Sequence, residues 1–89
     1  MRKVEFHGDA MDELTEWFEE DRKTGLRVMR LIKECRRTPF EGIGKPEPLK
    51  HALSGYWSRR ITDEHRMVYR VEGDAVLIAQ LRYHYGPSD

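Results

Sequence analysis

The chain has 89 residues, of which 38% are hydrophobic and 36% are charged, and its formal net charge is zero. This length fits one domain with a single core, and the periodic apolar residues exclude a disordered chain. A single cysteine, Cys35, excludes an internal disulfide framework. No segment has the apolar run of a secretory signal or a membrane span, so we expect a cytoplasmic protein.

The first elements are a short strand and two amphipathic helices. Val4 and Phe6 alternate with polar residues, which predicts a strand, and Asp9 is a candidate N-cap for the first helix. After a short break at residues 21–25, a second helix should end before Pro39, because the residue preceding proline avoids the helical conformation. The short break predicts an antiparallel helix hairpin.

These two helices carry opposite charges. Residues 9–21 contain seven acidic residues and no Lys or Arg, whereas residues 22–37 contain seven basic residues and one acid. Charged faces steer association with partners, but two solvated helices ordinarily carry such residues as well. The pattern leaves both interpretations open.

The second half of the chain predicts a sheet. Residues 38–48 are rich in Pro and Gly and should form an ordered loop leading into residues 47–53, for which one helical turn is an alternative. Three strands at 56–61, 66–71 and 75–83 then read as an antiparallel meander. In the last strand we expect strict alternation, with Ala75, Leu77, Ala79 and Leu81 on one face and Val76, Ile78, Gln80, Arg82 and His84 on the other. The fold class is therefore α+β: a small single domain with an N-terminal strand, a two-helix hairpin and a three-stranded meander in one twisted sheet.

Three residues suit RNA cleavage without a metal. The 2′-hydroxyl of RNA attacks its own phosphate if the protein supplies a base, a cation and an acid. Glu47, between two prolines, is the candidate base; Arg66 is the candidate cation, and His84, with an ordinary pKa of about 6.5, is the candidate acid. Each also has an alternative, purely structural interpretation. Glu47 could be a solvated loop carboxylate, Arg66 could form a salt bridge with Asp63 or Glu64, and His84 could lie at a solvated chain end.

Other residues have supporting chemistry. Arg59 and Arg60 are adjacent on a strand, so one can face the reaction and the other solvent or an RNA strand. Lys50 would share a helical face with Glu47, and either Tyr83 or Tyr85 could stack on a base. The histidines and the cysteine lack a recognised zinc-ligand spacing, so we expect no metal and no cofactor.

Residues 44–69, which contain Gly-Lys-Pro-Glu-Pro-Leu-Lys-His, Ser-Gly-Tyr-Trp-Ser-Arg-Arg-Ile-Thr and Glu-His-Arg-Met-Val-Tyr, resemble the YoeB toxins of the RelE-like superfamily. Thr-Pro-Phe-Glu-Gly at 38–42 and Arg-Tyr-His-Tyr at 82–85 match as well. The resemblance implies an mRNA endonuclease that acts in the A site of the 70S ribosome, forms a homodimer and is silenced by a YefM-type antitoxin. It also implies that Glu47 is the base, Arg66 the transition-state cation and His84 the acid, with supporting roles for Lys50, Arg60 and Tyr85.

The same resemblance places the toxin domain at residues 1–85. Family members commonly end at the His-Tyr pair, so residues 86–89 form a short extra tail that could partly cover the site. A second class of function uses the same surface: a non-catalytic module that holds RNA or an acidic peptide by its arginines and aromatics. An assay for cleavage of mRNA on translating ribosomes distinguishes the nuclease from the non-catalytic module.

Overall fold

The computed structural model describes residues 1–84, so the expectations for Tyr85 and for the tail at 86–89 lie outside it. Its elements are β1 (Lys3–Phe6), α1 (Ala10–Glu20), α2 (Arg22–Arg37), β2 (Glu47–Pro48), the 3-10 turn η1 (His51–Leu53), β3 (Trp57–Arg60), β4 (His65–Glu72) and β5 (Ala75–His84). The α+β prediction is confirmed. In this part of the chain, no helix has the length and apolar character needed to cross a membrane.

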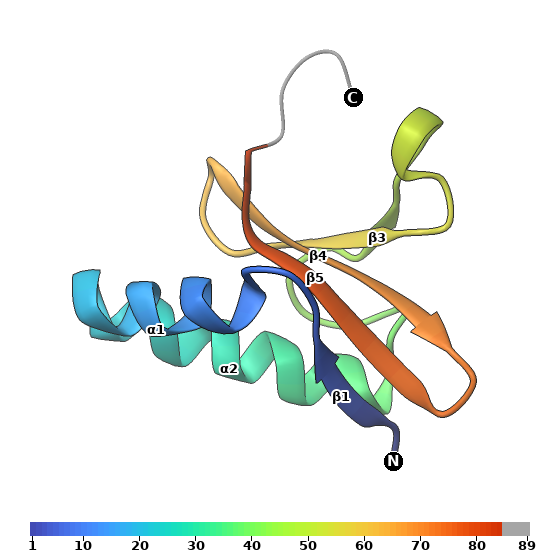
Figure 1. The fold of residues 1–89 in the computed structure, drawn as a ribbon, viewed down its shortest axis with the longest axis horizontal. Coiled ribbons are helices and arrows are strands. Elements are labelled where there is room, and N and C mark those ends of the chain that lie inside the picture. Colours follow the sequence, from blue (N-terminus) through green and yellow to red (C-terminus); the bar gives the residue numbers. More distant parts are fainter. Residues whose placement is uncertain (85–89) are drawn as a thin grey trace.

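The five strands form one sheet in the order β1-β5-β4-β3-β2. β5 pairs with β4 in an antiparallel ladder and with β1 in a parallel one, so the last strand of the chain lies inside the sheet (Figure 1). The predicted meander of β3, β4 and β5 is confirmed. β2 is a fifth strand that the sequence did not predict. It consists of two residues at the sheet edge, where Pro48 is tolerated because the edge needs no further N–H donor.

The break between the helices is one residue long, not the predicted 21–25. The Asp21 side chain accepts hydrogen bonds from the backbone N–H groups of Lys23 and Thr24, and α2 begins directly after it. A Cβ on Gly25 would lie 2.7 Å from the Phe18 ring, so glycine allows the two helices to approach closely at the hairpin. One capping carboxylate is therefore enough to separate the helices.

α1 and α2 cover one face of the sheet (Figure 1), which we call the helix face. The core between helices and sheet consists mainly of α2, β4 and β5 side chains: Val28, Leu31, Ile32, Cys35, Met67, Tyr69, Val76, Ile78 and Leu81. We call the opposite side of the sheet the second face.

Two ionisable groups lie within this core, and they predict a loss of stability in alkali. Desolvation raises the pKa of Cys35 from 9.0 to about 11 and that of Tyr69 from 10.0 to about 12. The unfolded chain therefore releases these protons at lower pH than the folded one. The stabilisation is complete below about pH 9 and is lost as the pH rises through about 11 for the thiol and about 12 for the phenol.

Urea unfolding at pH 8 and pH 10.5 measures this effect. Wild type should lose on the order of 2 kcal/mol over this interval through Cys35, since one unit of pKa shift corresponds to about 1.4 kcal/mol. Cys35→Ala should lose less than wild type between the two pH values, because only Tyr69 then retains a raised pKa. Equal losses in both proteins would contradict the assignment.

Candidate active site

Register brings two arginines and a tyrosine together on the second face. Arg60 of β3 pairs with Arg66 of β4, and Arg66 pairs with Tyr83 of β5. Paired residues of antiparallel strands project from the same face, with Cβ atoms about 5 Å apart. Two guanidinium groups at such positions repel each other, and an anion bound between them removes that repulsion. This part of the sheet is therefore suited to a phosphate.

Glu47 joins the same face from the sheet edge. It pairs with Ser58, which lies two residues from Arg60 on β3 and points the same way. Standard strand spacings place the Cα atoms of Glu47 and Arg66 about 12 Å apart. Because Glu and Arg side chains extend several ångströms each, both can reach one phosphodiester.

The loop at residues 38–46 carries Glu47, and Arg59 holds this loop from beneath. The Arg59 guanidinium is fully buried and donates to the backbone carbonyls of Thr38, Glu41 and Ile43, and its Nε donates to the Tyr69 hydroxyl at 3.3 Å. The expectation that one of the two adjacent arginines faces solvent or RNA is wrong for Arg59. Side chains alternate along β3, so Arg59 points toward the helix face, where the loop carbonyls accept its hydrogen bonds.

Gly44 seats the end of this loop on β3. Its carbonyl accepts the Arg60 N–H at 2.7 Å, and its φ of +82° lies in the region that favours glycine. A Cβ there would lie 2.8 Å from Leu31 Cδ2, so no larger residue fits without displacement. The backbone immediately before Glu47 is thus tightly constrained.

Lys50 does not share a helical turn with Glu47. Glu47 is in β2, whereas Lys50 is the N-cap of η1, which begins at His51. The helical turn lies later than predicted because residues 47–48 pair with β3 instead. Lys50 is exposed, close in sequence to the base but on a different element.

The end of β5 departs from strict alternation. Its register against β4 shifts twice, since Tyr69, Val68 and Arg66 pair with Ile78, Gln80 and Tyr83 respectively. β5 therefore contains two extra residues, as in β-bulges. Gln80 consequently lies on the second face beside Val68, and Leu81 enters the helix-face core, both contrary to the predicted pattern.

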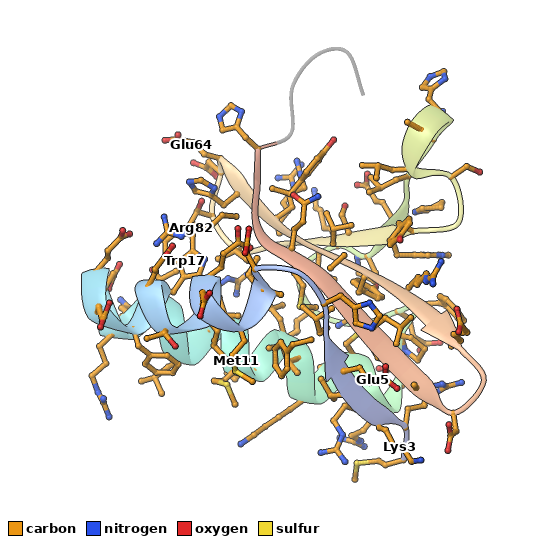
Figure 2. The ribbon with its side chains drawn as sticks, viewed as in Figure 1. Lys3, Glu5, Met11, Trp17, Glu64 and Arg82 are labelled. Atoms are coloured by element: carbon orange, nitrogen blue, oxygen red, sulfur yellow. The ribbon has the colours of Figure 1, made fainter. Side chains whose placement is uncertain are left out.

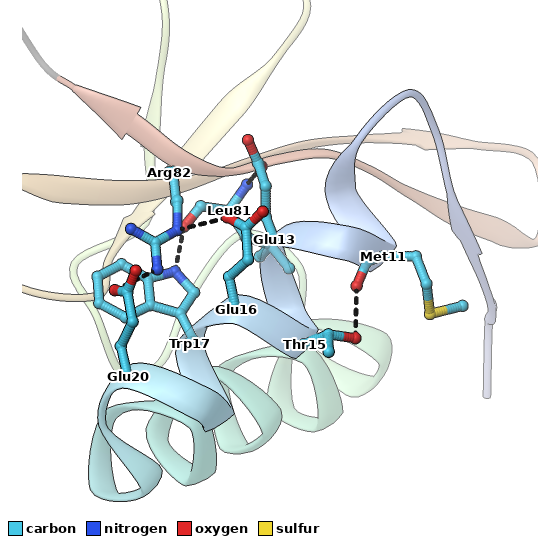
Figure 3. Close-up of polar contacts among 8 residues, drawn as sticks. All are labelled: Met11, Glu13, Thr15, Glu16, Trp17, Glu20, Leu81 and Arg82. Atoms are coloured by element: carbon cyan, nitrogen blue, oxygen red, sulfur yellow. Dashed lines mark hydrogen bonds and ion pairs between the residues drawn. The ribbon is translucent and has the colours of Figure 1, made fainter.

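α1 holds this bulged strand end (Figure 3). Glu13 accepts the Leu81 N–H at 2.7 Å, and the Trp17 indole donates to the Leu81 carbonyl at 2.7 Å. Arg82 lies over the Trp17 ring at 4.1 Å and forms ion pairs with Glu16 and Glu20 at 3.3 and 2.6 Å. Sequence reasoning missed this cluster: its acids share one face of α1, but nothing in their spacing identifies Leu81 and Arg82 as partners.

His84 lies on the helix face, away from Arg66. It pairs with His65, whose ring contacts Trp17 edge-on at 5.2 Å, and the two imidazole centroids are 6.1 Å apart. His84 Nε2 lies 4.0 Å from Glu64, which Figure 2 shows near this end of the sheet, and the His84 side chain is 67% exposed. The structure thus brings Glu47, Arg60 and Arg66 to one face, with Tyr83 rather than His84 beside them. Within residues 1–84, no three His, Cys, Asp or Glu side chains are grouped to hold a metal ion.

Comparison with known proteins agrees with this fold. The family model for the YoeB-like toxin of bacterial type II toxin–antitoxin systems matches residues 6–85. Toxin YoeB of Mycobacterium bovis is 58% identical over 85 residues, which cover 96% of this chain and all of that protein. Among solved structures, a YoeB dimer from Staphylococcus aureus is 40% identical with a TM-score of 0.85, covering 94% of this chain and 98% of that one. A heterotetrameric YoeB–YefM complex from the same organism is also 40% identical, with a TM-score of 0.84 and coverage of 96% and 99%.

The small α+β fold and the matched family define the protein as a toxin of a type II toxin–antitoxin system. Within that class, the chain belongs to the YoeB family. The resemblance drawn from residues 38–42, 44–69 and 82–85 is therefore confirmed.

Proposed function

We propose that the protein is a ribosome-dependent endoribonuclease that cuts mRNA in the A site by attack of the 2′-hydroxyl. The observation that carries this proposal is the position of Glu47 beside the cross-strand pair of Arg60 and Arg66 on one sheet face. A carboxylate and two guanidinium groups are the chemistry that in-line attack on a phosphodiester requires. Family membership supports the proposal, and the relatives are toxins.

In this mechanism Glu47 accepts the 2′ proton, and the pair of arginines stabilises the charge of the phosphorane. Bidentate guanidinium–phosphate contacts favour Arg over Lys at both positions. His84 protonates the departing 5′ oxygen, which requires the backbone at the end of β5 to rotate when RNA is bound, so that the His84 side chain leaves His65 and reaches the face of Arg66. Lys50 and Tyr85 are proposed to bind the RNA beside the scissile phosphate. These roles are complete without a metal ion.

We also propose the partners. Relatives from Staphylococcus aureus are solved as a dimer and in complex with YefM. By analogy this toxin forms a homodimer in the cytoplasm and binds a YefM-type antitoxin. An antitoxin segment that covers the second face would silence the toxin without unfolding it, because that face contains the proposed site.

The test uses translating ribosomes, a short mRNA and saturating toxin, with cleavage mapped by primer extension. Glu47→Gln and His84→Gln should each lower the single-turnover rate by about 10²-fold, the usual contribution of general acid–base catalysis. Glu19→Gln and His7→Gln are matched controls at exposed positions outside the site and should cleave at the wild-type rate. An equimolar YefM-type antitoxin should stop the reaction.

Two outcomes would change the proposal. Ribosome binding by the wild type without any cut would make the surface a non-catalytic RNA-binding module. Loss of activity in Tyr83→Phe together with full activity in His84→Gln would move the acid role to Tyr83, the residue paired with Arg66. We expect Tyr83→Phe to stay within a few-fold of wild type, because the proposed mechanism assigns the proton transfer to His84 and none to the Tyr83 hydroxyl.

A further inference from the structure

A cluster of arginines lies where the N-terminal segment meets the last turn of α2, at the end of β5 opposite His84 (Figure 1). Arg2 directly precedes β1 and has the strand parity of Val4, which packs against the core, so its side chain points toward α2. Arg36 and Arg37 are the last two residues of α2. Arg36 Nε donates to the backbone carbonyl of Arg2 at 3.1 Å, which holds the helix end beside the N-terminal segment.

The three arginines surround a hollow of about 540 Å³, which we call the Arg2 hollow. The turn between β4 and β5 forms its other wall, and β1 is fixed to this turn because the Lys3 N–H donates to the Asp74 carbonyl at 2.7 Å. Gly73 in the turn has a φ of +58° and no side chain to narrow the hollow. The complete lining is Met1, Arg2, Arg36, Arg37, Gly73 and Asp74.

The charge of the Arg2 hollow is unbalanced. Asp74 is the single acid in its lining, and its carboxylate lies 3.9 Å from Lys3 Nζ instead of pairing with an arginine. Within residues 1–84, none of the three arginines takes part in a salt bridge. Like charges that line one hollow repel each other, and a bound anion removes this repulsion. Three guanidinium groups against one carboxylate therefore favour an anion that carries several charges.

Arg2 gives a second, independent indication of a ligand. Its Nε is shielded from solvent and has no hydrogen-bond partner among the described residues. A buried N–H group without a partner destabilises the fold, and most such groups in proteins are paired. A small rotation of the side chain turns Nε and a terminal N–H toward the hollow, and these are the two donors with which arginine binds a phosphate. An oxyanion in the hollow can therefore supply the missing partner.

We propose that the Arg2 hollow binds a small polyphosphate anion, either inorganic or the phosphate chain of a nucleotide. The planar fork of arginine suits phosphate oxygens, and two linked phosphate groups offer enough oxygens and charge for three arginines. No aromatic side chain is among the six lining residues, so a nucleotide base is not recognised by stacking. An RNA backbone fits less well, because it needs cations along an extended groove and this hollow is a single concavity. The proposal does not depend on the nuclease activity.

Titration calorimetry with sodium pyrophosphate, at constant ionic strength and without magnesium, tests the proposal. Arg2→Gln should raise the Kd by at least about 10-fold, because it removes a charge-assisted pair of hydrogen bonds. Arg22→Gln/Lys23→Gln is the matched control, since it removes two exposed cations at the other end of α2, and it should bind as wild type. Arg66→Ala, which lacks the proposed phosphate-binding cation of the second face, should retain the binding that depends on Arg2. A nucleoside diphosphate should bind within a few-fold of pyrophosphate.

Thermal unfolding separates a ligand site from a structural contact. Without ligand, Arg2→Gln should unfold at the wild-type temperature or above it, because the substitution removes an unpaired donor and a repelling charge. Pyrophosphate at about ten times its wild-type Kd should raise the wild-type midpoint by roughly 5–10 °C, and that of Arg2→Gln by about a third as much or less.

Three outcomes would overturn the proposal. Equal pyrophosphate affinity in wild type and Arg2→Gln would make Arg2 a structural residue without a ligand. Loss of all binding in Arg66→Ala would place the anion on the second face. Displacement of pyrophosphate from wild type by an RNA hexamer without terminal phosphates would assign the hollow to a nucleic-acid backbone. Each result leaves the test of mRNA cleavage unaffected.

Discussion

Replacing Arg66 by alanine is expected to lower the single-turnover rate of mRNA cleavage on the ribosome by about 10²–10³-fold, the usual cost of removing one preorganised charge from a transition state. The Arg66 side chain is 9% exposed and lies opposite Arg60, where charge on a phosphorane would develop. Ground-state binding should fall much less, because the phosphate gains charge only as the 2′ oxygen attacks.

Arg66→Lys should recover part of the rate and not all of it, since lysine lacks the planar fork that binds two phosphate oxygens. Arg70→Ala is the matched control: this residue lies on the same strand and face, forms an ion pair with Glu72 and lies over the Tyr56 ring, and has no role in the proposed mechanism. Ribosome affinity and the rate of bound toxin are measured separately. If Arg66→Ala reduces both by the same factor, Arg66 is a docking residue.

The second large effect concerns the buried guanidinium beneath the loop. Arg59→Met should lower the free energy of unfolding by about 3–5 kcal/mol, because it leaves the carbonyls of residues 38, 41 and 43 without their donor in a buried site. The free energy of unfolding of a domain is about 5–15 kcal/mol in total, so a substantial fraction of the variant should be unfolded near the growth temperature of the cell.

Urea unfolding measures this loss. Arg60→Met is a suitable comparison, since it changes the neighbouring residue on the other face of β3 and should cost less than about 1 kcal/mol. Equal losses in the two variants would show that the carbonyl network contributes little. Folded Arg59→Met should also cleave more slowly, because the same loop carries Glu47.

Most of the fold could be predicted from local patterns. Apolar periodicity located both helices and the strands β1, β3, β4 and β5, and Pro39 gave the end of α2, which the structure places at Arg37. β2 escaped prediction because a two-residue strand is defined by its partner β3 and not by its own sequence. The start of α2 was missed because Asp21 alone both ends one helix and caps the next.

The candidate site was predictable where the alternation of side chains along a strand determines the sheet face on which a residue lies. Arg60, Arg66 and Glu47 share a face because β3 pairs regularly with both neighbours. The face of the residues that follow Ile78 was not predictable, because Glu13 and Trp17 hold the bulge at Leu81 across separations of 68 and 64 residues. The contacts of Arg59 were not predictable for a similar reason. Strand alternation predicts that its side chain points toward the helix face, but the three carbonyls that it binds come together only when the loop is folded.

The position of β5 has a consequence for synthesis of the toxin. β5 contains the last described residues, yet it lies between β1 and β4 and supplies part of the core. A nascent chain that lacks these residues has no partner for β1 and cannot close the sheet, and contacts so distant in sequence form late. Incomplete chains, whether stalled or made from a cut message, therefore cannot fold into a working toxin. Toxicity therefore requires that β5 has left the ribosome that made it.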